Sequence, residues 1–160
     1  MKKIVSTTVF NQLKVRNIKM KKVLKVILIV VIILIVILLI NSIRNIYIIT
    51  KAINLSFNNI YNSNKIVNLT TSFNGEISSA KQMAKDTALS DKKISPKILL
   101  FDYHFEFKDI VFQIIYIKDN CYRIRVKDIY LYIDKDTGYR IKDEIPKMNA
   151  YVTYEYFDEK

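Results

Sequence analysis

The longest feature of the hydropathy pattern is an apolar run near the N-terminus. Residues 26–40 are all Val, Ile or Leu, and Val23 and Leu24 extend the run with Lys25 as its polar interruption. A helix of 18 residues covers about 27 Å, which is close to the hydrocarbon thickness of a bilayer. Lys25 lies near one end of the run, where its side chain can reach the lipid headgroups. The pattern predicts a transmembrane helix over residues 23–41.

The residues that flank this span indicate an uncleaved signal anchor in single-pass topology. No small-x-small cleavage site follows the apolar run, so we expect the helix to be retained. Eight basic residues and no acidic residue precede Asn41, whereas three basic residues follow in the next 25 positions. The positive-inside rule therefore predicts a cytoplasmic tail over residues 1–22 and an extracytoplasmic chain from about residue 42 onward.

The charge distribution narrows the classes of partner. The net charge is +11, but 15 basic and 15 acidic residues cancel from Glu76 to the end. Because the excess lies beside the predicted span, we attribute it to topology and to attraction by anionic lipid, and we expect no nucleic-acid partner.

A second Met-Lys-Lys at Met20 leaves two alternatives for residues 1–19, an upstream extension or a cytoplasmic tail.

Beyond the span, apolar residues recur three and four positions apart, which predicts a juxtamembrane helix over residues 42–62. Its apolar stripe consists of Ile46, Ile49, Ile53, Phe57, Ile60 and Tyr61. Its polar side is expected to hold Arg44, Asn45, Lys51, Asn54 and Asn58. Such a stripe needs an apolar partner, for which we expect the domain that follows, with the membrane surface as the alternative.

From about residue 63 the period changes to two, which predicts an antiparallel β domain over residues 63–160. Asn74-Gly75 is a tight-turn signal between a first strand and its return strand. The strongest alternation is "ILLFDYHFEF", residues 98–107, with aromatic residues at every second position. Further strands are expected over residues 110–117, 122–126, 129–133, 139–145 and 150–157. The predicted fold class is α+β, with a sheet arranged as a meander or a half-barrel.

The chain contains few groups with catalytic or metal-binding potential. His104 is the only histidine, and Asp102 and Glu106 share its side of the predicted strand. Alternate positions on a strand lie about 6.8 Å apart, which is awkward for one metal ion, so we expect a solvated polar face. Cys121 is the only cysteine, which leaves no internal disulfide. Nearby Arg123 could lower its thiol pKa, as could Arg125, but no activating partner accompanies it.

The run Asp134-Lys-Asp-Thr-Gly138 is predicted to be an ordinary hairpin turn. As a calcium loop it lacks the closing glutamate, because Ile145 stands at that position. The neighbours of Asp136 also differ from those in phosphatase and aspartic-protease motifs. We therefore expect no cofactor, no metal and no enzymatic activity.

The stretch "YIKDNCYRIRVKDIYLYIDKDTGYRIKDE", residues 116–144, resembles the lipoprotein-carrier family and its germination-associated lipoprotein relatives. The shared element is the Asp-x-x-Thr-Gly turn within repeated strand-turn-strand units. The resemblance implies a curved half-barrel that holds a lipid. This chain is shorter and lacks the lipid-bearing cysteine of those relatives.

Together these features predict a membrane-anchored β domain with a non-catalytic binding or scaffolding role in a bacterial cell envelope. Abundant Ile, Lys, Asn and Tyr is typical of an AT-rich genome. The predicted contact surface for an envelope protein consists of Tyr130, Tyr132 and Tyr151, since exposed tyrosines often anchor interfaces. A half-barrel that carries a lipid or peptide is one alternative. An envelope hydrolase using Asp102, His104 or Asp136 is the other.

Overall fold

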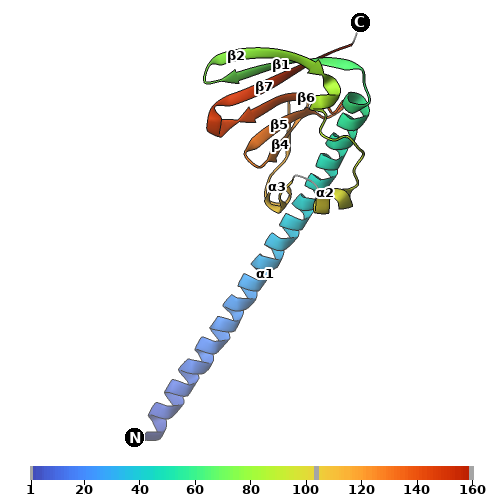
Figure 1. Cartoon of the computed structure of the whole chain (residues 1–160). Coiled ribbons are helices and arrows are strands. Elements are labelled where there is room, and N and C mark those ends of the chain that lie inside the picture. Colours follow the sequence, from blue (N-terminus) through green and yellow to red (C-terminus); the bar gives the residue numbers. More distant parts are fainter. Residues whose placement is uncertain (1, 103–104, 159–160) are drawn as a thin grey trace. The chain divides into compact units, whose positions relative to one another are not determined.

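The computed structural model describes the backbone of residues 2–102 and 105–158 and the side chains of residues 20–99 and 105–158. The chain divides into two units, Met1–Ile40 and Asn41–Lys160. Helix α1 (Lys2–Ser56) begins in the first unit and ends in the second. Figure 1 shows the order of the elements along the chain.

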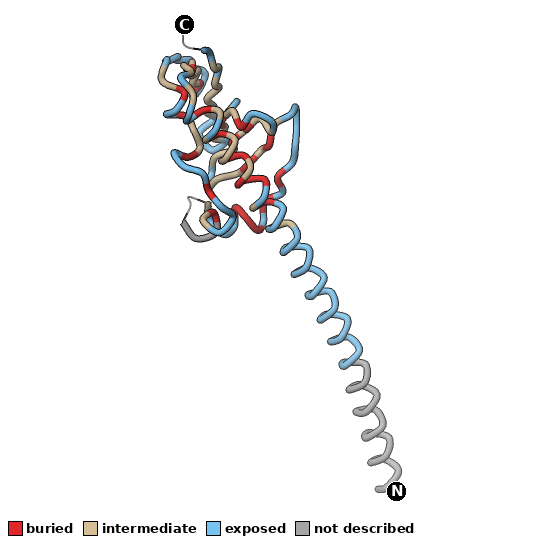
Figure 2. Tube along the Cα trace, turned by 90° about the vertical axis from the view of Figure 1, so that its right-hand side faces the viewer, coloured by how far each residue is buried: buried red, intermediate tan, exposed pale blue. Residues whose placement is uncertain are grey.

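The first unit is helical, and its described side chains, residues 20–40, are all exposed. Within the described chain, one helical stretch, Met20–Tyr61, is long and apolar enough to span a membrane. An apolar helix without protein cover agrees with the predicted span, because lipid can supply the missing apolar surroundings. Figure 2 shows the contrast with the second unit, which contains the buried positions.

The second unit is an α+β domain with a seven-stranded antiparallel sheet, as predicted. Its strands are β1 (Lys65–Phe73), β2 (Glu76–Met83), β3 (Tyr116–Lys118), β4 (Cys121–Val126), β5 (Ile129–Asp134), β6 (Arg140–Ile145) and β7 (Ala150–Asp158). The strand order is β2-β1-β7-β6-β5-β4-β3, so the last strand pairs with the first. Strands β3 to β7 form a meander, and the β1–β2 hairpin extends it beyond β7.

Short turns with positive φ set the register of these strands. Asn74 and Gly75 have φ of 50° and 89° and join paired residues at the ends of β1 and β2. Asp119 and Asn120 have φ of 50° and 62° and join β3 to β4. Two-residue turns of this kind match the twist of antiparallel strands. The predicted turns at Asn74-Gly75 and at residues 118–120 are confirmed.

The strand predicted over residues 98–107 is wrong where the structure describes it. Residues Pro96–Asp102 form helix α2, Phe107–Val111 form helix α3, and residues 103 and 104 lie outside the described backbone. Pro96 suits the first helical position because its missing N–H has no partner there. Glu106 and Asp109 form a capping box that begins α3. The caps at the beginning of these two helices favour helix more strongly than the alternation of aromatic residues favours a strand.

The strand predicted over residues 110–117 is also largely wrong. Only Tyr116–Lys118 pair as β3, whereas Ile110 and Val111 belong to α3.

A short 3₁₀ helix, η2 (Ala84–Thr87), follows β2, and another, η3 (Pro146–Met148), precedes β7. The strands predicted over residues 122–126, 129–133, 139–145 and 150–157 are confirmed within a few residues.

The second part of α1 packs on the inner face of the sheet. Ile48, Ile49 and Ile53 are buried against one cluster with the inward residues of β4 and β5. Those inward residues are Tyr122, Ile124, Leu131 and Ile133. The helix continues as a π-helical turn, η1 (Phe57–Tyr61), whose Ile60 joins a second cluster with Val67 and Ala84. The prediction that the domain covers this apolar stripe is confirmed for its isoleucines, whereas Tyr61 at its end is exposed.

Two asparagines predicted for the solvent side of this helix instead face the domain. Asn45 is fully buried and its Nδ2 donates to the carbonyls of Ile110 and Gln113, at 2.7 and 2.8 Å. Asn54 donates to the Ile94 carbonyl at 3.0 Å and accepts from the Ile94 N–H at 2.9 Å. Buried loop backbone without a strand partner needs such bonds, so polar residues share the packed side of the helix.

The Asp-x-x-Thr-Gly turn packs against the end of α1. Asn59 Nδ2 donates to the Thr137 carbonyl at 2.8 Å, and Asp134 Oδ1 accepts the Thr137 N–H at 2.7 Å. A Cβ added at Gly138 would lie 2.5 Å from both Leu55 Cβ and Ser56 N. The turn therefore has a structural function, because it lets the β5–β6 hairpin approach the helix backbone.

We expect Gly138→Ala to lower the free energy of unfolding by about 2–4 kcal/mol, since it adds an overpacking clash to a positive φ of 74°. The matched control is Gly75→Ala, at φ 89° with no atom within 4 Å of the added Cβ. That control should cost about 1 kcal/mol. Urea unfolding of the full chain in detergent micelles measures both. Equal losses would contradict the close approach.

Candidate functional site

The outer face of the sheet, opposite α1, brings the predicted tyrosines together. Strand pairing places Tyr130 opposite Arg125 on one side and Glu144 on the other, and Glu144 opposite Tyr151. One step along, Tyr132 lies between Arg123 and Lys142. Alternate residues of neighbouring strands share a face, so these side chains form one surface. We call it the tyrosine-cation face: Tyr116, Arg123, Arg125, Tyr130, Tyr132, Lys142, Glu144 and Tyr151.

Arg123 is at the centre of this face. Its guanidinium carbon lies 3.9 Å from the ring centroid of Tyr130, 5.6 Å from that of Tyr116 and 5.9 Å from that of Tyr132. It also donates a hydrogen bond from Nη1 to the Tyr116 hydroxyl. Cations over aromatic faces are held by the ring quadrupole. Arg123 therefore holds three tyrosine rings together on this face.

Lys142 plays a similar part toward β7. Its Nζ lies 5.0 Å from the Tyr151 ring centroid and 5.7 Å from that of Tyr132. The Tyr132 hydroxyl donates to Glu144 Oε2 at 2.7 Å. Burial, together with this hydrogen bond to Glu144, raises the pKa of Tyr132. The Tyr132 hydroxyl is thus engaged within the protein, while Tyr151 remains exposed at the end of the surface.

A hollow of about 200 Å³ opens on this face. Its lining consists of Gln113, Ile114, Tyr116, Arg123, Arg125 and Tyr130. Among the described residues, the buried Nε atoms of Arg123 and Arg125 have no hydrogen-bond partner. Arg125 Nε lies 3.7 Å from Asp109 Oδ1, which is an ion pair beyond hydrogen-bond length. The hollow therefore combines aromatic walls with positive charge.

The inner face contains a second, apolar cavity of about 180 Å³. It is lined by Ile49, Ala52, Ile53, Ala88, Leu89, Phe105, Ile124, Val126, Leu131, Ile133 and Arg140. Arg140 Nε donates to Asp143 Oδ1 at 2.7 Å, and the Tyr154 hydroxyl donates to Asp143 Oδ2 at 2.7 Å. Burial raises the pKa of Tyr154, so it remains a neutral donor. The polar groups at this cavity are paired with one another.

Of the residues considered for hydrolysis, Asp102, His104 and Asp136, the structure describes the side chain of Asp136. His104 and the side chain of Asp102 lie outside the described residues. Glu106 pairs with Lys108 at 2.7 Å, which lowers the pKa of its carboxyl, and Asp136 accepts from Asn120 Nδ2 at 3.0 Å. Over the described part of the chain, no group of three His, Cys, Asp or Glu side chains could hold a metal ion.

Cys121 begins β4, where it is partly buried. The suggestion that Arg123 and Arg125 lower its pKa is wrong, because burial raises the thiol pKa and the carboxylates of Asp134 and Asp119 raise it further. Cross-strand pairing places Asp134 directly opposite Cys121. A thiol in these surroundings is a weak nucleophile at neutral pH.

The cations of the tyrosine-cation face were not predicted as part of the contact surface. Arg123 and Arg125 alternate on β4, as Lys142 and Glu144 do on β6. This alternation is visible in the sequence and signals a polar face. Which tyrosine each cation meets depends on strand register, which alternation alone does not define.

Comparison of the chain with known protein families, curated protein sequences and solved structures finds no match. The resemblance of residues 116–144 to lipoprotein carriers therefore stays a prediction.

We expect the Cys121 thiol to be alkylated by iodoacetamide more slowly at pH 7 than glutathione, with its rate rising at higher pH, because its pKa is raised. Asp119→Asn removes one of the negative charges and suits the positive φ of 50° at that turn. This variant should move the rate profile to lower pH. A thiol that reacts faster than glutathione at pH 7 would contradict the raised pKa.

Proposed function

We propose that this protein is a single-pass membrane protein whose extracytoplasmic β domain binds an envelope protein through the tyrosine-cation face. The observation that carries the proposal is the strand register, which assembles Tyr130, Tyr132 and Tyr151 with three cations on one surface. Tyrosine and arginine are the residue types most enriched among residues that dominate binding energy. The proposed role is binding or scaffolding, without catalysis.

The apolar helix supports the membrane part of this proposal. The side chains of residues 20–40 are exposed and almost entirely apolar. Basic residues precede this stretch in excess over those that follow, which favours a cytoplasmic N-terminus. The domain then belongs to the outer side of a bacterial membrane.

The charges of the face favour a partner with acidic groups. Three cations, Arg123, Arg125 and Lys142, face two anions: Glu144 pairs with Lys142 at 3.7 Å and Asp109 with Arg125 at 3.7 Å. One positive charge is therefore in excess. A carboxylate from a partner can enter the hollow beside the guanidinium groups of Arg123 and Arg125. The rings around it can supply apolar contact area.

The packing of α1 favours this reading over a lipid or peptide carrier. Ile49 and Ile53 fill the inner face that a carrier would use for its ligand. The remaining cavity of about 180 Å³ is below the range of roughly 300–1,000 Å³ typical of small-molecule sites.

The proposed orientation predicts that a cysteine at position 79 is labelled from outside. In a Cys121→Ser background, Ser79→Cys places a thiol on exposed β2. A membrane-impermeant maleimide should label it in intact cells. The control Lys22→Cys should react only after permeabilisation, since it precedes the span. The reverse pattern would place the domain in the cytoplasm.

The contact surface predicts site-specific crosslinking in cells. A photoreactive benzoylphenylalanine at Tyr130 or Tyr151 should yield a defined adduct, whereas the same group at Ser79, exposed on β2, should not. Adding Arg123→Gln should reduce the adduct about tenfold or more, because a central arginine commonly contributes 2 kcal/mol or more to an interface.

Thermal unfolding of each variant is the control for an intact domain. Adducts of equal yield at positions 130 and 79, or adducts that survive Arg123→Gln in a stable domain, would contradict binding through this face. Identification of the adduct by mass spectrometry would then test for acidic residues at the crosslinked site.

A further inference from the structure

Three large apolar side chains are exposed along the segment that contains α3 and the loop after it. Phe107, Phe112 and Ile114 are 73%, 63% and 71% exposed. Their neighbours Ile110 and Ile115 are buried in the domain, at 3% and 0%. The segment is therefore well packed on one side and presents apolar groups outward on the other.

Side chains at the beginning of the second unit hold this segment in place. Asn41 Nδ2 donates to the carbonyls of Val111 and Gln113, at 3.0 and 2.9 Å. Asn45 Nδ2 donates to those of Ile110 and Gln113, at 2.7 and 2.8 Å. These bonds flank Phe112 on both sides, so its position is tied to the helix turn that begins at Asn41.

Arg44 extends this attachment by two residues, from Gln113 to Ile115. Its Nη2 donates to the Ile115 carbonyl at 2.7 Å. The Gln113 side chain is fixed as well, because it accepts from the Arg125 N–H at 2.8 Å and donates to the Asp109 carbonyl. The exposed apolar groups thus stand on a rigid support and not on a free loop.

The position of Asn41 in the chain indicates how close this segment lies to the predicted membrane span. Asn41 follows Ile40, the last residue of the uninterrupted apolar run, and α1 continues through both. At 1.5 Å per residue, Asn45 lies about 6 Å further along the helix axis than Asn41. When residues 23–41 occupy the bilayer, the turn from Asn41 to Asn45 lies at the membrane boundary.

Exposed apolar residues also lie on α1 within this turn and just beyond it. Ile43 and Tyr47 are 67% and 68% exposed, and they lie four residues apart on one side of the helix. Tyrosine at this level is typical of the headgroup region of membrane proteins. Exposed apolar groups therefore lie within about two helical turns of the predicted span, on the helix itself. Others lie on the segment that Asn41 and Asn45 bond.

We infer that Phe107, Phe112 and Ile114 insert into the outer lipid interface and dock the domain on the bilayer. This inference rests on the membrane anchoring proposed above, but not on the tyrosine-cation face. Apolar and aromatic groups on a fixed surface bury themselves at the headgroup and acyl boundary, as amphipathic helices do. Docking through a second contact beside the span fixes the tilt of the domain above the membrane.

The test is fluorescence of the full chain in nanodiscs, with an NBD label on a single introduced cysteine in a Cys121→Ser background. Phe112→Cys and Ile114→Cys report on the docking segment. The matched control is Ile77→Cys, because Ile77 is 70% exposed on β2, at the opposite edge of the sheet from β3. Ile33→Cys, within the apolar run, reports on insertion of the helix.

Lipids with a nitroxide near the carbonyl should remove about half of the fluorescence at positions 112 and 114, because insertion reaches that boundary. The label at position 77 should keep its fluorescence and be quenched by aqueous iodide. Changing Phe107→Ser should reduce lipid quenching at position 112 without affecting position 77, since one inserted group is then lost.

Three outcomes would overturn the inference, and they are distinguishable. If positions 112 and 77 respond alike to iodide while lipid nitroxides at depth quench position 33, the anchor stands and the docking fails. If position 112 is shielded from iodide but unaffected by nitroxide lipid, a protein surface such as a second copy covers it. If position 33 is not quenched by lipid, the proposed membrane anchoring fails as well.

Discussion

The burial of one side of α1 against the sheet is the constraint on which the domain depends. Ile49 and Ile53 are buried against the inward residues Ile124 and Ile133, and these side chains form the centre of the core. Neither partner can hide its apolar side alone, because a single-layer sheet and an isolated helix both leave one side in water. Their contact gives the sheet an inner and an outer face. The placement of the loops and of the tyrosine-cation face depends on which face of the sheet the helix covers.

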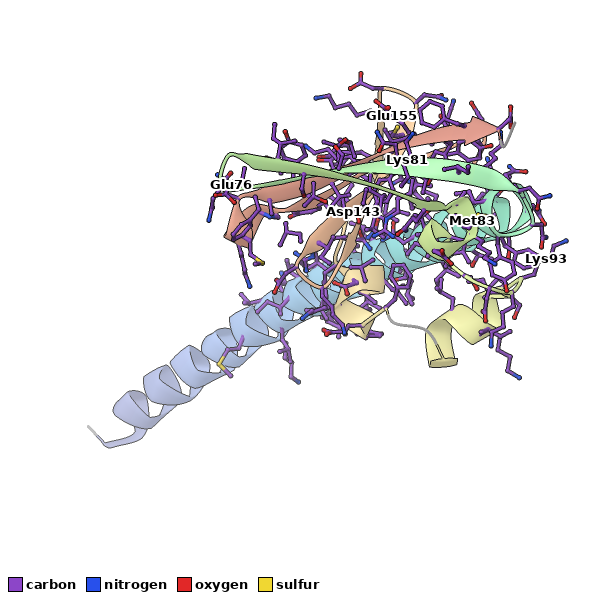
Figure 3. All side chains as sticks on the ribbon, turned by 45° about the horizontal axis from the view of Figure 1, so that its top comes forward. Glu76, Lys81, Met83, Lys93, Asp143 and Glu155 are labelled. Carbon is purple, nitrogen blue, oxygen red and sulfur yellow. The ribbon has the colours of Figure 1, made fainter. Side chains whose placement is uncertain are left out.

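Polar contacts then attach the irregular parts of the chain to the same helix. Asn45 and Asn54 donate hydrogen bonds to backbone groups of loops that lack strand partners. Gly138 lets the turn between β5 and β6 reach the helix backbone. Figure 3 labels Asp143, which lies on β6 shortly after this turn. In a dry interior each unpaired backbone group is costly, so these hydrogen bonds stabilise the domain together with the buried isoleucines. The helix therefore contributes to the hydrophobic core and also holds the loops in place.

The same division separates the two surfaces for which we propose roles. The helix fills the inner face, so tyrosines and cations gather on the outer face, where strand register sets Arg123 between Tyr130 and Tyr132. The apolar segment with Phe112 lies instead beside Asn41, where the helix enters the domain. One surface is suited to a charged partner and the other to lipid. The Arg-lined hollow includes Ile114, so the two surfaces meet at that residue.

The sequence alone determined the features that depend on local pattern. The apolar run predicted a helix long enough to span a membrane, Asn74-Gly75 predicted a hairpin, and alternation predicted the strands from Tyr122 onward. These signals are local because chain length, turn geometry and side-chain period act within a few residues. The structure showed that local caps make residues 96–102 and 107–111 helical despite their aromatic alternation. Only the tertiary structure decided that Asn45 is buried and that Arg123 meets Tyr130. The burial of Asn45 depends on a hydrogen bond to a residue 65 positions away. The contact of Arg123 with Tyr130 depends on strand register, because the sequence of one strand does not specify which residues of its neighbour it pairs with.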